Sequence, residues 1–74
     1  MFIEFDLSKL RNIGYDLHLI QHDIAVWANR YGIPYTQKTI KRTLRLAFDQ
    51  DRFYTVFATT WNSEFDYRLI DRRW

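Results

Sequence analysis

The stretch RTLRLAFDQDRFYTVFATTW, residues 42–61, decides the fold of this chain, because it fits two different structures. Extended back to residue 36, its first half fits a helix in which Ile40, Leu44 and Phe48 recur at i, i+4 and i+8. The same half fits a strand with these residues and Leu46 on one face, and periodicity alone does not separate the two. The β-branched residues before Leu44 and the β-forming run FYTVFATTW favour strands. We therefore predict a β-hairpin with residues 49–52, DQDR, as its loop.

The loop fixes which residues face each other across the two predicted strands, because a slip of one residue would turn every side chain to the other face. The predicted inner face is then a ladder of mostly large apolar residues. The opposed pairs are Phe48 and Phe53, Leu46 and Thr55, Leu44 and Phe57, and Ile40 and Trp61.

The N-terminal third changes from a strand pattern to a helix pattern. Residues 2–7, FIEFDL, place Ile3, Phe5 and Leu7 on one side, with the period of a half-buried strand. After them, apolar residues recur at spacings of three and four, as on the buried side of an amphipathic helix. The same spacing also fits a coiled-coil seam. The residues of this stripe are Leu10, Ile13, Leu17, Ile20, Ile24, Trp27 and Tyr31.

The ends of that helix have recognisable signals. Ser8 is a candidate N-cap, and Asp16 is a second candidate start because Gly14 would weaken a helix that ran through it. Gly32 suits the left-handed position that ends a helix, and Pro34 cannot continue one. We expect one long helix that stops at Gly32.

These elements predict a single α+β domain over residues 1–74, with one long helix packed on a small antiparallel sheet in the order β-α-β-β-β. The last strand is expected over residues 65–73, after a turn at residues 62–64. The alternative is a helix-turn-helix, in which residues 36–48 form a basic recognition helix and residues 53–72 a β-hairpin wing. That helix would carry the nucleic-acid-binding residues Lys38, Lys41, Arg42 and Arg45.

Composition indicates a small protein without covalent cross-links. The chain has 74 residues, no cysteine, and 11 basic against 9 acidic residues. A formal charge of +2 permits binding to nucleic acid without requiring it. The N-terminus lacks the basic and apolar regions of a signal peptide, and no apolar run is long enough for a membrane span. We therefore expect a cytoplasmic protein.

The motifs do not predict an enzyme, a cofactor or a metal site. His18 and His22 stand at i and i+4, the spacing of paired zinc ligands, but Leu19 occupies the position of the zincin glutamate and no third ligand is apparent. Two glycines, Gly14 and Gly32, cannot form a phosphate-binding loop. Function is therefore expected to reside in a surface.

The predicted sheet has an outward face in which a small apolar floor is surrounded by basic residues, a composition typical of protein interfaces. We expect a small non-enzymatic protein-binding module, an inhibitor or adaptor of phage or mobile-element type that occludes a larger protein partner. Binding of nucleic acid and formation of a homodimer stay open. The predicted contact residues are Lys41, Arg45, Tyr54, Val56, Arg68, Ile70 and Arg72.

Overall fold

The computed structural model describes residues 1–61 and 66–72. It confirms the α+β class, with a four-stranded antiparallel sheet and three helices, but the single long helix and the order β-α-β-β-β are wrong. The predicted turn at 62–64 lies outside the described residues, as do residues 65 and 73 of the predicted last strand. In chain order the elements are β1 (Phe2–Asp6), α1 (Leu7–Asn12), α2 (Leu17–Tyr31), β2 (Tyr35–Ile40), β3 (Thr43–Phe48), α3 (Arg52–Thr60) and β4 (Arg68–Ile70).

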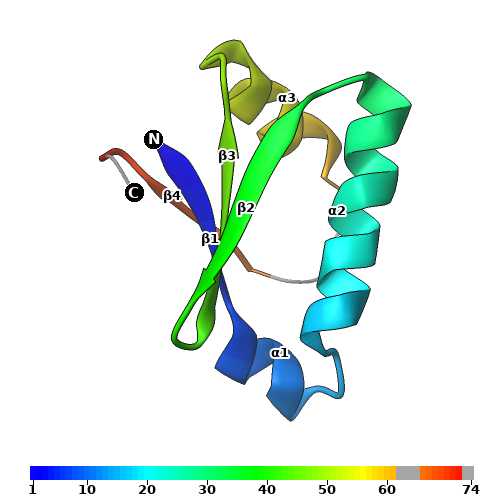
Figure 1. The fold of residues 1–74 in the computed structure, drawn as a ribbon, viewed down its shortest axis with the longest axis vertical. Helices are drawn as coiled ribbons and strands as arrows, with labels where there is room; N and C mark the ends of the chain where they lie inside the picture. The colour runs from blue at the N-terminus through cyan, green and yellow to red at the C-terminus, as the bar shows by residue number, and fades with distance from the viewer. Residues whose placement is uncertain (62–65, 73–74) are drawn as a thin grey trace.

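The strands lie in the order β2-β3-β1-β4, and every neighbouring pair is antiparallel (Figure 1). With α1 and α2 counted as one interrupted crossover, the chain follows the β-α-β-β-α-β path of a split β-α-β fold. The two central strands, β1 and β3, are therefore far apart in sequence. Pairing β1 with β3 requires the connection through α1, α2 and β2 to fold back, and pairing β1 with β4 requires the connection through α3.

The observed hairpin lies earlier in the chain than the predicted one, which had its loop at residues 49–52. β2 and β3 pair through a turn at Lys41 and Arg42, with Ile40 opposite Thr43. Residues 36–48 are thus neither one strand nor a recognition helix, so the helix-turn-helix alternative is wrong. The predicted wing over residues 53–72 is also wrong, because its first half is α3 and β4 pairs with β1.

Residues 52–60 are helical although they are rich in β-forming side chains. Phe53 and Phe57 of the helix and Trp61 at its C-cap recur at i, i+4 and i+8 and pack on the core, whereas Thr55 and Thr59 are exposed. A strand would have turned both threonines to the same side as Phe57. Burial of a continuous aromatic face therefore overrides the intrinsic preference for strand.

The predicted long helix is divided at Gly14, which adopts a left-handed backbone with φ of 78°. Asp16 restarts the helix as the N-cap of α2, and its carboxylate accepts a hydrogen bond from the Leu19 N–H at 3.1 Å. At the earlier start the cap is Asp6, which accepts from the Ser8 N–H at 2.9 Å. The second predicted start is confirmed, and the assignment of Ser8 as a cap is wrong.

The predicted end of the helix is confirmed. Gly32 has φ of 65° at the C-cap of α2, and the Ile33 N–H donates to the Ala28 carbonyl at 2.9 Å. Ile33 then folds back and is buried. After this helix end the chain continues into β2.

The core lies between the sheet and the helices. In α2 the stripe is buried at Ile20, Ile24 and Trp27, whereas Tyr31 at its end is 43% exposed. Ile13, which the division at Gly14 removes from the helix, is 65% exposed. A core role of the stripe therefore explains its spacing without a coiled coil. The best-buried core residues are Ile3 and Phe5 of β1, Ile20 and Ile24 of α2, Leu44 and Leu46 of β3, and Phe57 of α3.

The hydroxyl of Tyr54 completes the pairing of β1 with β3. The Leu7 N–H donates to the Arg42 carbonyl at 2.8 Å, in line with the register that pairs Ile3 with Leu46. The next hydrogen-bonded pair in that register would be Met1 with Phe48. At this point the Tyr54 hydroxyl accepts from the Phe48 N–H at 3.0 Å and donates to the Met1 carbonyl at 2.7 Å. Tyr54 is only 5% exposed, so its predicted outward position is wrong.

We predict that Tyr54→Phe lowers the free energy of unfolding by about 2 kcal/mol, because it leaves a buried N–H and a carbonyl without their partner. Urea unfolding measures this change. The matched control is Tyr31→Phe at the exposed end of α2, which should change stability by less than about 0.5 kcal/mol. Equal effects of the two substitutions would show that the hydroxyl of Tyr54 does not stabilise the sheet.

A second prediction concerns the hairpin turn. Lys41 has φ of 55°, a left-handed conformation that costs an ordinary L-residue roughly 1–2 kcal/mol. Asparagine tolerates this region, so Lys41→Asn should raise the free energy of unfolding by about 0.5–1 kcal/mol. Arg42→Asn, at the neighbouring turn position without positive φ, should bring no such gain. Equal gains at both positions would refute the explanation by backbone strain.

Candidate interaction surface

The helices cover one face of the sheet, and we call the opposite face the outer face (Figure 1). Its members follow from the register, because residues opposite each other in antiparallel strands point to the same side. Lys38 pairs with Arg45, Arg45 with Glu4, and Glu4 with Arg68, so one row of side chains crosses all four strands. The outer face comprises Thr36, Lys38 and Ile40 of β2, Thr43, Arg45 and Ala47 of β3, Phe2, Glu4 and Asp6 of β1, and Arg68 and Ile70 of β4.

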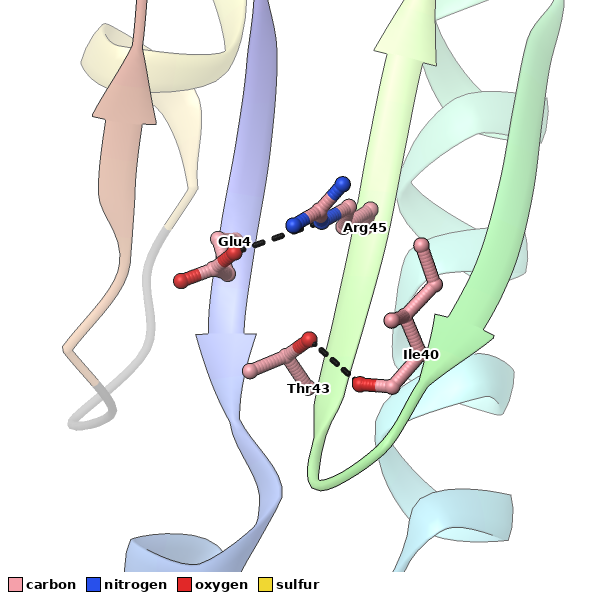
Figure 2. Close-up of polar contacts among 4 residues, drawn as sticks. All are labelled: Glu4, Ile40, Thr43 and Arg45. Carbon is pink, nitrogen blue, oxygen red and sulfur yellow. Dashed lines mark hydrogen bonds and ion pairs between the residues drawn. The ribbon is translucent and has the colours of Figure 1, made fainter. Parts of the chain in front are cut away.

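Arg45 organises the middle of the outer face. Its Nε lies 3.3 Å from Glu4 Oε2, and Figure 2 shows the two side chains reaching toward each other from β3 and β1. The guanidinium carbon also lies 4.7 Å from the ring centroid of Phe2, within the range of a cation–π contact. Phe2 has no exposed surface although it is on the helix-free side of the sheet. Arg45 therefore contributes to sealing an aromatic side chain that lies outside the main core.

One end of the outer face is fixed by the hairpin turn. The Thr43 hydroxyl donates to the Ile40 carbonyl at 2.8 Å, as Figure 2 shows. Ile40 is half-buried beside it, as are Ala47 and Ile70 farther along the face. These apolar side chains form small patches between the charged ones.

Electrostatically the outer face is basic. Lys38, Arg45 and Arg68 contribute three positive charges in the row across the strands, against two negative charges from Glu4, between Arg45 and Arg68, and from Asp6 at the end of β1. Arg72 follows β4 and is exposed. An acidic partner would meet favourable charge over most of this surface.

The structure brings together only part of the predicted contact set. Arg45, Arg68 and Ile70 lie on the outer face. Tyr54 and Val56 belong to α3, in the helical layer, so the prediction that Val56 forms part of the apolar floor is wrong. Lys41 lies in the hairpin turn rather than in a strand.

Sequence reasoning missed Phe2, Glu4 and Ile40 as members of this surface. Ile40 was placed inward because residues 40–48 were treated as one strand. The turn at Lys41 and Arg42 contains neither glycine nor asparagine, so the usual sequence signal for a two-residue turn is absent.

The alternative nucleic-acid residues are separated as well. Lys38 and Arg45 are cross-strand neighbours on the outer face. Lys41 and Arg42 instead line a shallow hollow with Arg11, at the end of the sheet where α1 begins. They do not form the single basic stripe that a recognition helix would have presented.

His18 and His22 are both exposed on α2. Within residues 1–61 and 66–72, no group of three or more histidine, cysteine, aspartate or glutamate side chains is arranged to hold a metal ion. Among the same residues, none of the helices has the length and apolar character needed to cross a membrane. No family model, no curated protein and no solved structure matches the chain. The fold and the outer face therefore define it only as a small α+β protein with one sheet face that no described helix covers and on which basic residues outnumber acidic ones.

We predict that Arg45→Ala lowers the free energy of unfolding by about 1–2 kcal/mol, because it uncovers Phe2 and leaves the largely buried Glu4 without its ion pair. Thermal and urea unfolding measure this loss. Arg68→Ala is the matched control, since Arg68 is exposed on the same face and should change stability by less than about 0.5 kcal/mol. A loss as large for Arg68→Ala as for Arg45→Ala would contradict a special role of Arg45.

Proposed function

We propose that this protein is a small non-enzymatic binding module that contacts an acidic protein partner through its outer face. The observation that carries the proposal is the uncovered sheet face itself. There Lys38, Arg45 and Arg68 cross the sheet in one row, next to the apolar side chains Ile40 and Ile70. Arginine beside apolar patches is a composition found at protein interfaces.

A protein partner fits this face better than single-stranded nucleic acid does. Recognition of unpaired bases uses exposed aromatic side chains as stacking platforms. Among the described residues of the outer face the aromatic side chain is Phe2, and it is fully buried. The basic row could still attract phosphate, so nucleic acid is retained as an outcome of the test.

A domain of this size is suited to occlusion. No described helix lies over the outer face, so the domain can present this face to a site on a larger protein without moving a helix aside. We therefore propose an inhibitor or adaptor role, as for proteins encoded by phages or mobile elements, acting where the chain is synthesised in the cytoplasm. In this mechanism Arg68 and Arg72 form ion pairs with the partner, and Ile70 is desolvated between them.

The test uses affinity capture from a host lysate to obtain a partner, followed by titration calorimetry with the purified partner. Arg68→Ala should weaken binding by more than about 1 kcal/mol, the range of an interface hot spot, without changing stability. The charge-matched control is Arg30→Ala in the last turn of α2, which should leave the affinity within about twofold because it removes no contact of a hot-spot type. Equal losses in the two variants would indicate a response to net charge and would refute the assignment of the outer face.

Fluorescence anisotropy with mixed-sequence DNA and RNA distinguishes the other class of partner. Binding to nucleic acid through counterion release falls steeply with added salt, whereas binding to a protein with an apolar centre falls gently. If the protein binds nucleic acid tightly, if added salt weakens this binding steeply and if Arg68→Ala abolishes it, the partner is nucleic acid and the proposal of a protein partner is wrong.

A further inference from the structure

The free edge of the sheet at β2 supports an inference that goes beyond the outer face. β2 is the first strand in the sheet order and pairs with β3 alone among the described strands. Figure 1 shows α2 beside β2 and no described strand beyond it. Thr36, Gln37 and Thr39 are exposed along it. An edge strand of this kind presents backbone donors and acceptors that another strand can pair with.

The outward-pointing backbone groups of β2 can be identified from the register. The Leu7 N–H to Arg42 carbonyl bond shows that Arg42, and hence every second residue of β3 after it, points its backbone groups toward β1. The intervening residues, such as Arg45, then bond to β2 through their opposite partners, such as Lys38. On β2 the backbone groups of Tyr35, Gln37 and Thr39 are therefore the ones that point away from the sheet.

We propose that β2 pairs with β2 of a second copy of this chain, antiparallel and centred on Gln37, to form a two-fold symmetric dimer. In this register Gln37 lies opposite Gln37 of the second copy, and Tyr35 lies opposite Thr39. Every outward-pointing N–H and C=O of the strand then has a partner. The two sheets join into one continuous sheet, with the helices of both copies on the same side.

Competing registers are less favourable because they oppose like charges or extend beyond the ends of β2. Hydrogen-bonded pairs require both residues to point their backbone groups at each other, so Tyr35, Gln37 and Thr39 can pair only among themselves. Centring the pair on Lys38 would place two like charges directly opposite each other, which is destabilising. It would also place Tyr35 opposite Lys41, beyond the end of the strand. Centring it on Thr36 would place Thr39 opposite Ile33, before the strand begins.

The Gln37-centred register also avoids a charge conflict between side chains. Lys38 lies on the outer side of the seam, opposite Thr36 of the second copy. On the helix side, small residues lie next to the start of the strand. Ala25, Ala28 and Asn29 of α2 line a shallow hollow beside Tyr35, so the side chains of α2 next to the start of β2 are short. A second strand can therefore approach β2 without meeting long side chains from this part of α2.

A charge-reversal experiment tests the dimer, read by sedimentation equilibrium from micromolar to millimolar concentration in the absence of any partner. Wild-type chain should self-associate. Gln37→Lys and Gln37→Glu should each raise the monomer–dimer dissociation constant about fivefold, because each places like charges opposite each other at the centre of the seam. An equimolar mixture of the two variants should form the heterodimer at least as readily as the wild type dimerises.

Thr55→Lys is the matched control for Gln37→Lys. Thr55 is exposed on α3, so this substitution adds the same charge away from the β2 edge. It should leave the dissociation constant unchanged. A wild-type chain that is monomeric at millimolar concentration would overturn the proposal. So would a dimer that Gln37→Lys and Thr55→Lys weaken equally. Neither result would test the proposed binding of an acidic partner through Arg68, because no partner is present in these measurements.

Discussion

The fold depends on burial of the aromatic side of α3 against the sheet and α2. Phe57 has no exposed surface. Its ring centroid lies 5.0 Å from that of Trp27, 4.9 Å from that of Trp61 and 6.3 Å from that of Phe5. One side chain therefore joins both helical connections to a central strand. A chain of 74 residues without cysteine has no covalent substitute for such contacts. The same helix positions Tyr54, whose hydroxyl closes the gap at the end of the β1–β3 pairing.

Placing every helix on one side of the sheet determines the chemistry of the other side. Phe2 lies on that outer face and yet is fully buried, so its ring is not covered by α1, α2 or α3. Arg45 helps to cover it with a guanidinium group while its Nε holds Glu4. An arginine suits this position because its planar group can stack on a ring and donate to a carboxylate at once. The outer face is thus a surface whose centre is structural and whose rim, at Arg68 and Arg72, is available for contacts.

The sequence predicts local features with a single strong signal and misses those that depend on distant packing. β1, the buried stripe of α2 and the helix end at Gly32 are correct, because alternation, helical spacing and a left-handed glycine are each visible within a few residues. α3 was missed because its residues favour strand, and only the requirement to bury Phe53, Phe57 and Trp61 on one side selects the helix. The informative signal was the polarity of Thr55 and Thr59, which a strand would have turned inward.

Part of the outer face could be predicted, because Arg45, Arg68 and Ile70 keep an outward position in both the expected and the observed sheet. The rest could not, because it depends on the turn at Lys41. A lysine with φ of 55° replaces the glycine or asparagine that would have marked this turn in the sequence. Once the turn is missed, Ile40 is assigned to the wrong face and Lys38 is separated from Arg45.

The proposed β2 seam and the outer face are coupled by charge. Joining two β2 edges places the outer faces of both copies on one side of a continuous sheet, so two chains with a formal charge of +2 each are brought together. Long-range repulsion opposes this approach, and salt screens it over a Debye length of about 8–10 Å. Added salt therefore favours self-association while it weakens attraction to an acidic partner. An acidic partner bound across both outer faces would itself neutralise the repulsion, and its attachment at two sites would raise the apparent affinity without any new contact. Self-pairing and partner binding would then support each other, because each lowers the electrostatic cost of the other.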